Sequence, residues 1–200
     1  VKKLIIGGGA VSSELERELQ KINSKVFATY GMTETISHIA VRPLNGKEKS
    51  PIFTALPKVN FSQTESGCLQ IHAPEISEET VVTNDVVELL SKTSFKFLGR
   101  IDNVINTGGV KVHPEVMEEK LSKHIQQPFF IASEQDEALG ERVILIIESE
   151  KQLQLEDYWE AFETLSAYEK PKKLYTIPQF VYTDTGKIKR VEVLKKLTIP

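Results

Sequence analysis

The sequence has a single cysteine, Cys68, and no long uninterrupted apolar stretch. One cysteine cannot build a disulfide framework or a cysteine-rich metal site, and this scarcity is typical of the reducing cytoplasm. No segment approaches the roughly 18 apolar residues that a membrane-spanning helix needs. The patterns G-x-x-x-x-G-K-[ST] and G-x-G-x-x-G are also absent, so the standard phosphate loop and dinucleotide loop are excluded.

An excess of basic charge is missing as well. The formal net charge of the 200 residues is −3, which gives no reason to expect a nucleic-acid partner. The charge is uneven, with a net of −10 over residues 101–169 and +6 over residues 170–200. The basic tail is either ordinary solvated surface or a local positive field for a phosphate-bearing ligand, and charge alone leaves both open.

The order of apolar runs and turn residues predicts two domains. A buried strand at 2–6, a helix with a capping box from Ser13 to Glu16, and a strand at 25–29 form an α/β opening. Short runs then predict a small, mostly antiparallel β-structure over 39–97: IAV, ALPKVNF, CLQIH, VVELL and FKFLG. A compact α+β unit follows, with a Gly108-Gly109 turn, a helix at 114–125 that begins with Pro114, and strands at 129–132 and 142–148. An amphipathic helix is expected at 155–168, through Leu155, Trp159, Phe162 and Leu165. We expect the domains to be 1–101 and 102–200.

Several short motifs combine groups that could bind a nucleotide, although each also has an ordinary structural explanation. Gly7–Gly9 ends a strand, where a tight turn or a close approach to a ligand is expected. Residues 30–35 offer an aromatic ring, a glycine, hydroxyls and a carboxylate, which suit a purine, a phosphate and Mg²⁺ or simply form a polar loop. Asp85 could cap a turn, residues 99–103 could be a hinge or a surface turn, and Lys187 follows a glycine on what we expect to be a flexible loop.

Taken in order, these motifs resemble the later core motifs of the adenylate-forming superfamily, which includes acyl-CoA synthetases, peptide-synthetase adenylation domains and luciferases. The six segments are GGGA, YGMTET, ESGCLQI, VTND, FLGRIDNVINTGG and TGKIKR. The resemblance covers nearly the whole chain. Within the superfamily, YGMTETISHIAVRPLNG, GCLQIHAP and DNVINTGGVKVHPE are most similar to the o-succinylbenzoate–CoA ligases of menaquinone biosynthesis.

The resemblance implies a two-step acid–thiol ligase that uses ATP, Mg²⁺ and coenzyme A on a small carboxylic acid. The acid attacks the α-phosphate of ATP to give an acyl-adenylate and pyrophosphate, and the coenzyme A thiol then gives a thioester and AMP. It also implies a fold in which the end of the large N-terminal domain precedes a small mobile α+β lid domain.

The resemblance assigns roles to individual residues. Thr33 and Lys187 would meet phosphate oxygens, and Glu34 would hold Mg²⁺. Asp102 would be the hinge of the lid domain. The cofactor-binding set would be Gly8, Gly9, Ala10, Tyr30, Gly31, Met32, Asp85, Arg100, Gly108 and Gly109. Tyr30 would stack on adenine and Asp85 would accept the ribose hydroxyls, with Arg100 beside it. The Gly108-Gly109 segment would face the coenzyme A tunnel, and Ser37 and His38 would contact the acid or simply pack.

Two departures bear on these roles. Asn84 stands where most of the superfamily has glycine, and the Ser/Thr/Gly-rich phosphate loop is absent from the 200 residues. The sequence therefore resembles the last part of a longer ligase, and we expect these residues alone to be inactive. Three alternatives stay open: a ligase for another acid, a carrier-protein adenylation domain, and a silent module that binds ATP or AMP.

Overall fold

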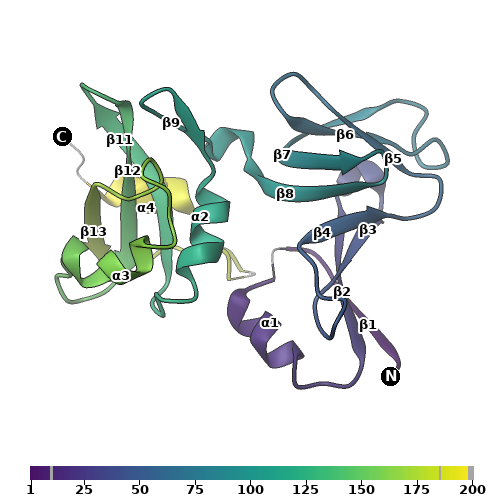
Figure 1. Ribbon diagram of the computed structural model, residues 1–200, viewed down its shortest axis with the longest axis horizontal. Helices are drawn as coiled ribbons and strands as arrows, with labels where there is room; N and C mark the ends of the chain where they lie inside the picture. Colours follow the sequence, from purple (N-terminus) through teal and green to yellow (C-terminus); the bar gives the residue numbers. More distant parts are fainter. Residues whose placement is uncertain (10, 185, 198–200) are drawn as a thin grey trace. The chain divides into compact units, whose positions relative to one another are not determined.

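The computed structural model describes residues 1–9, 11–184 and 186–197 (Figure 1). The chain forms two units, Val1–Asp102 and Asn103–Pro200. The boundary expected from the sequence, after residue 101, lies one residue earlier.

An eight-stranded sheet in the order β1-β2-β3-β4-β8-β7-β6-β5 forms the body of the first unit. Its strands are β1 (Lys3–Ile6), β2 (Lys25–Gly31), β3 (His38–Pro43), β4 (Ile52–Ala55), β5 (Asn60–Gln63), β6 (Cys68–His72), β7 (Val81–Ser91) and β8 (Ser94–Arg100). Strands β1 and β2 run parallel, whereas each later neighbouring pair runs antiparallel. The α/β opening and the β-rich region therefore share one sheet.

The helix α1 (Ser13–Leu19) connects the two parallel strands, as predicted, but its cap is different. Ser12, not Ser13, is the N-cap, and its Oγ accepts the backbone N–H of Leu15 at 3.1 Å. The capping-box prediction is wrong by one residue: Ser12 caps the helix although Leu15, not a Glu or Gln, stands three residues after it. Leu19 is the residue of α1 that joins a buried cluster on β2, which contains Val26 and Ala28.

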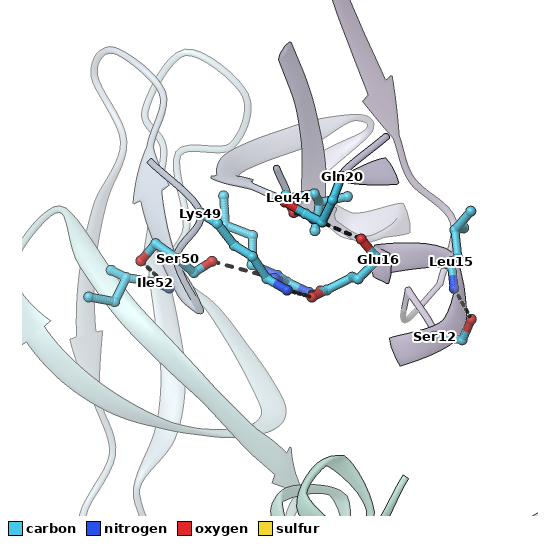
Figure 2. A network of polar contacts seen from close by, with 9 residues as sticks. Ser12, Leu15, Glu16, Gln20, Leu44, Lys49, Ser50 and Ile52 are labelled. Atoms are coloured by element: carbon cyan, nitrogen blue, oxygen red, sulfur yellow. Dashed lines mark hydrogen bonds and ion pairs between the residues drawn. The ribbon is translucent and has the colours of Figure 1, made fainter. Parts of the chain in front are cut away.

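A polar network holds α1 against the sheet (Figure 2). Glu16 pairs with Arg42 Nη2 of β3 at 2.6 Å and with Lys49 Nζ at 2.9 Å. Gln20 Nε2 donates to the carbonyl oxygen of Leu44 at 2.8 Å. Burial by itself raises the pKa of Glu16, but hydrogen bonds and charges from Lys49 and Arg42 outweigh it and hold that pKa below its usual value.

Strand β1 is exposed, not buried as the sequence predicts. Leu4 and Ile5 are exposed, and Ile5 retains 57% of its accessible surface. Strand β1 lies at the edge of the sheet, so it has a partner strand on one side, and Ile6 is the residue that reaches the cluster under α1. An apolar run predicts a strand, but it does not say what covers it.

The predicted run ALPKVNF divides between two strands. Ala55 ends β4 and Asn60 begins β5, and a turn between them places Lys58 at a φ of 67°. The other runs in this region lie in the predicted strands, which surround a core containing Phe61, Ile71 and Phe95.

The second unit is an α+β unit, as predicted, and its central strand is buried on both faces. Its elements are β9 (Ile105–Thr107), β10 (Val110–Val112), α2 (Pro114–Leu121), β11 (Phe129–Asp136), β12 (Gly140–Glu148), α3 (Trp159–Phe162), β13 (Lys173–Ile177) and α4 (Arg190–Lys196). The sheet order is β10-β9-β12-β11, and β13 pairs with β12 in parallel. Figure 1 shows α2 and α3 on one face and α4 on the other. Val143, Leu145 and Ile147 of β12 belong to the core cluster that α2 and α3 cover, and Ile144 and Ile146 belong to the cluster that α4 covers.

The predicted helix at 155–168 is much shorter in the structure. A 3-10 turn at Leu155–Tyr158 leads into the four-residue α3. Phe162 and Leu165 are buried as predicted, but Trp159 is 61% exposed. Two apolar positions three residues apart, Phe162 and Leu165, are therefore buried without a continuous helix, because turns also bury residues at this spacing.

No helix in the described part of the chain is long and apolar enough to cross a membrane.

Candidate active site

The triple glycine lies where β1 ends, beside the parallel strand β2. A Cβ on Gly7 would stand 2.4 Å from Thr29 Oγ1 of β2, so the close approach of the two segments requires glycine. Gly8 has a φ of 87°, which L side chains rarely adopt, and Gly9 follows it. Ala10, expected to belong to the same site, lies outside the described residues. The turn thus has both a packing reason and a conformational reason for its glycines.

Tyr30 lies near the end of β2 and is held by other aromatic rings. Its ring packs edge-on against Phe95, at 5.2 Å between centroids and 77°, and is tilted against Phe53 at 5.7 Å. This packing holds the Tyr30 ring in one orientation, whereas the ring of an exposed tyrosine could change its orientation more freely.

The hydroxyl of Tyr30 donates a hydrogen bond to Asp85 Oδ2 at 2.5 Å, and this bond connects β2 to β7. Asp85 is 7% exposed, and Arg100 Nη1 of β8 lies 3.3 Å from its Oδ1. Burial, followed by the hydrogen bond to Asp85, raises the pKa of the Tyr30 phenol far above its usual value, so the phenol remains a donor. The structure therefore joins three predicted site residues in one polar cluster.

Asp85 stands within β7 and does not cap a turn. The buried Thr83 Oγ1 accepts the backbone N–H of Asp85 at 3.0 Å. Asn84 points its side chain to the exposed face of the same strand. Alternate residues of a strand face opposite sides. The asparagine that replaces the superfamily glycine therefore does not crowd the face of β7 that carries the Asp85 side chain.

Arg100 also connects Asp85 to Asp102. Its Nη2 lies 3.9 Å from Asp102 Oδ2, in a 3-10 turn that spans Ile101–Asn103. The segment predicted as a hinge or a surface turn is thus the last turn of the first unit, continuing into the second.

The residues after Tyr30 form a loop that is organised by Thr35, a residue with no assigned role in the sequence motifs. Thr35 is buried, and its Oγ1 accepts the N–H of Met32 at 3.0 Å and donates to the carbonyl oxygen of Ser37 at 2.8 Å. Thr33 and Glu34 are exposed in the turn that Thr35 closes. A threonine inside a short polar loop often bonds the backbone in this way, which is the signal that could have found it.

Gly31 allows the loop to return close to its own start. A Cβ on Gly31 would stand 2.4 Å from the carbonyl oxygen of Ser37 and 2.8 Å from the Cα of His38. The side chains of Ser37 and His38 are exposed and hydrogen-bonded to each other, with Ser37 Oγ 3.1 Å from His38 Nδ1. The loop therefore presents Thr33, Glu34 and His38 to the surface.

In the second unit, Gly108 and Gly109 form the tight turn of the β9–β10 hairpin. Their φ values are 58° and 79°, as the two-residue type I′ turn requires, and the predicted turn is confirmed. The N–H of Gly108 donates to the carbonyl oxygen of Leu139 at 2.9 Å. A Cβ on Gly109 would meet no atom within 4 Å, so its backbone can be approached closely.

Lys187 lies on a hydrogen-bonded hairpin, whereas its sequence context predicts a flexible loop. Its carbonyl oxygen accepts the N–H of Thr183 at 2.8 Å, and its own N–H donates to Thr183 Oγ1 at 3.0 Å. Tyr182 and Ile188 form an antiparallel bridge on either side. Thr185 of the predicted motif lies outside the described residues, and Lys187 is exposed.

Six curated relatives match this chain, and they carry the name 2-succinylbenzoate–CoA ligase at 22–24% identity. The Escherichia coli protein is 22% identical over 95% of this chain and 45% of its own length. The chain resembles the C-terminal portion of the 2-succinylbenzoate–CoA ligases. It spans a little under half the length of these curated relatives. No family model matches it.

Two solved structures extend the comparison. An acyl-CoA synthetase (AMP-forming)/AMP-acid ligase II-like protein from Dyadobacter fermentans is 35% identical, with a TM-score of 0.53, over 98% of this chain and 58% of that chain. The o-succinylbenzoate CoA synthetase from Bacillus subtilis, in complex with the acyl-adenylate intermediate, has a TM-score of 0.78 at 19% identity, over 96% of this chain and 46% of that one. The chain therefore has the fold of the matching part of these acyl-CoA synthetases.

Proposed function

We propose that this chain supplies part of the nucleotide site and the catalytic lysine of an ATP-dependent acid–CoA ligase that acts on 2-succinylbenzoate. The observation that carries the proposal is the shared name of the six curated relatives, which match 94–98% of the chain. The cluster of Tyr30, Asp85 and Arg100 supports it, because these groups can meet the base, ribose and phosphates of a nucleotide.

In the first half-reaction the acid attacks the α-phosphate of ATP. Asp85, whose carboxylate is already oriented by Tyr30 and Arg100, would accept the ribose hydroxyls, and the ring of Tyr30 would lie against adenine. The glycines at Gly8 and Gly9 would let the backbone approach the nucleotide. A preoriented site lowers the conformational entropy that is lost when the substrate binds.

Glu34 fits a magnesium ion. Magnesium is usually held by one or two carboxylates together with substrate phosphates and water, and Glu34 is an exposed carboxylate that follows the exposed Thr33 in the chain. No cluster of three or more metal-ligating side chains occurs in the part of the chain that the structure describes, so phosphate oxygens would complete the coordination. The bound ion would neutralise charge on the phosphates, and Thr33 would donate to the α-phosphate.

Lys187 would stabilise the charge that develops on the α-phosphate during adenylation. We propose that residues 102–200 form a mobile lid that turns about Asp102 between the half-reactions. The Gly108-Gly109 turn, whose backbone is open to close approach, would then face the pantetheine arm of coenzyme A. Ser37 and His38 would contact the acid. We also propose a cytoplasmic location, because a single cysteine leaves no disulfide framework.

The test uses the product of the complete reading frame that encodes these residues. We expect it to release pyrophosphate with 2-succinylbenzoate, ATP and Mg²⁺, and to form the thioester when coenzyme A is added. Absence of pyrophosphate with this acid, together with release for another acid, would overturn the substrate assignment. Binding of AMP without turnover of any acid would instead identify a silent nucleotide-binding module.

A ligase for a different acid is the second candidate. It is favoured by the 35% identity to the Dyadobacter fermentans protein, because the curated 2-succinylbenzoate–CoA ligases are 22–24% identical. A panel of aromatic and aliphatic acids in the pyrophosphate assay separates the two candidates. Offering coenzyme A against a phosphopantetheinylated carrier protein then distinguishes a CoA ligase from a carrier-protein adenylation domain.

A further inference from the structure

The hairpin that carries Lys187 begins after Phe180, beyond the end of β13 at Ile177, and ends at Arg190, the first residue of α4. Each of these ends meets a carboxylate from a different element. Neither carboxylate belongs to a motif found in the sequence.

Glu148, the last residue of β12, holds the outgoing end. Its Oε2 accepts the N–H of Phe180 at 3.2 Å and the hydroxyl of Tyr182. Phe180 is buried and packs against Phe130 with ring centroids 5.4 Å apart. Burial, followed by the hydrogen bond to Glu148, raises the pKa of Tyr182 to about 12, so its phenol stays a donor at neutral pH. The segment is therefore attached at a hydrophobic anchor and a polar anchor two residues apart.

Glu118 of α2 holds the returning end. Its Oε1 accepts the N–H of Ile131 at 2.8 Å, and its Oε2 pairs with Arg190 Nη2 at 2.7 Å. The guanidinium of Arg190 lies 5.6 Å from the ring centroid of Phe130. Because one oxygen of Glu118 is fixed by the backbone of β11, the other can hold Arg190 in a defined position. Arg190 follows Lys187 by three residues and begins α4.

The two anchors act on one short hairpin. The bridge between Tyr182 and Ile188 and the bond from the N–H of Lys189 to the carbonyl oxygen of Val181, at 2.8 Å, join the outgoing and returning strands. A displacement at either anchor is therefore transmitted to the turn that carries Lys187.

We infer that Glu118 and Glu148 are positioning residues that set the place of the Lys187 ammonium, Glu118 through Arg190 and Glu148 through Tyr182. This inference rests on the proposed function, since it assigns Lys187 to adenylation. A misplacement of about 1 Å in a reacting geometry can cost on the order of a hundredfold in rate. The loss of either anchor should therefore slow adenylation and spare thioester formation, in which Lys187 takes no part.

The experiment compares Glu118→Gln and Glu148→Gln with the matched control Glu169→Gln. Glu169 has the same kinds of contact as Glu118: it pairs with Lys120 of α2 at 3.0 Å, accepts the N–H of Ser166 at 2.8 Å, and its side chain is 15% exposed against 19% for Glu118. The two differ in charge, because burial raises the pKa of Glu118 to about 7, whereas the pKa of Glu169 is lowered. In the product of the complete reading frame, pyrophosphate release measures adenylation, and thioester formation from supplied acyl-adenylate measures the second step.

We expect both anchor variants to lower the kcat of adenylation about tenfold or more, with the KM for ATP and the second step within about twofold of wild type. Glu169→Gln should leave both steps within that range. Arg190→Gln combined with Glu118→Gln should be no slower than either single variant, because both remove one contact. Equal slowing of both steps, or an effect no larger than that of Glu169→Gln, would overturn the inference.

Amide hydrogen exchange on the 200-residue chain tests the anchors without any turnover. The N–H groups of Lys187 and Lys189 should exchange faster in both anchor variants and at the wild-type rate in Glu169→Gln. Unchanged exchange would count against the anchors whatever the enzyme does. An inactive wild-type enzyme with faster exchange in the variants would refute the proposed function and leave the anchoring established.

Discussion

The phenol of Tyr30 and the carboxylate of Asp85 meet at 2.5 Å although 55 residues separate them in the sequence. The contact joins the end of the parallel part of the sheet to the long antiparallel strand β7. Asp85 also receives Arg100 at 3.3 Å, so both of its oxygens are oriented before any ligand binds. Each carboxylate oxygen has a second lone pair, which leaves room for ribose hydroxyls. Tyr30 thus has a positioning role in addition to the stacking role implied by the resemblance.

Tyr30→Phe separates these two roles because it keeps the ring and removes the donor. A buried acceptor left without its donor costs about 1–3 kcal/mol, and Arg100 alone orients Asp85 less well. We expect the first unit to be destabilised by about that amount and the dissociation constant of AMP to rise about tenfold. Denaturant unfolding followed by amide signals of the first unit, together with calorimetric titration of AMP, measures both.

Tyr175→Phe is the matched control. It removes a phenol–carboxylate bond of 2.6 Å, from Tyr175 to the buried Glu134, in the second unit. It should destabilise that unit and leave AMP binding unchanged. Wild-type affinity for AMP in Tyr30→Phe would show that the hydroxyl contributes nothing to the nucleotide site.

Gly7→Ala should destabilise the first unit because its new Cβ meets Thr29 Oγ1 at 2.4 Å. Overpacking of this kind typically costs about 1–3 kcal/mol. The obstacle is a side chain, so adding Thr29→Ala should restore most of the lost stability in denaturant unfolding. If the double variant is as unstable as Gly7→Ala, the close contact is not the reason for glycine at this position.

Gly31→Ala should introduce a steric clash that, unlike the clash in Gly7→Ala, no change of another side chain can relieve. Its Cβ meets backbone atoms, the carbonyl oxygen of Ser37 at 2.4 Å and the Cα of His38 at 2.8 Å. We expect a larger loss of stability than for Gly7→Ala and weaker AMP binding, because the loop that carries Thr33 and Glu34 has to move. Thermal unfolding and AMP titration check the two effects, and tolerance of this variant would contradict the loop geometry.

Local patterns predicted most elements of this fold and fewer of its contacts. The turn at Gly108-Gly109 and the start of α2 at Pro114 follow from the conformational preferences of glycine and proline themselves. Both predictions are confirmed. The exposure of Ile5 and the short α3 depend on what packs against them, which periodicity does not contain. The hydrogen bond from Tyr30 to Asp85 and the anchors at Glu118 and Glu148 join distant segments, and a single sequence gives no signal for such pairs.

Glu16 predicts a defined dependence of stability on pH. Its pKa in the folded chain is lowered below 4.5, so its ion pairs with Arg42 and Lys49 stabilise the first unit above that pH. This contribution is lost as the pH falls through the folded pKa. We expect wild type to exceed Glu16→Gln in unfolding free energy at pH 6–7, and the difference to close as the pH falls below 4.5. A carbon NMR titration of Glu16 gives the pKa directly, and a value above 4.5 or a constant difference would refute the prediction.

Lys187→Ala tests the central assignment of the proposed function. A preorganised cation aimed at developing charge typically contributes on the order of a hundredfold to a thousandfold in rate, so adenylation should fall by about that factor. Thioester formation from supplied acyl-adenylate should stay within about twofold of wild type, since Lys187 serves the first step only. Lys189→Ala is the matched control, because Lys189 is also an exposed lysine of this segment and its ammonium pairs with Glu192 at 3.3 Å. It should change neither half-reaction by more than about twofold, and equal loss of both half-reactions in Lys187→Ala would remove the lysine from its role in adenylation.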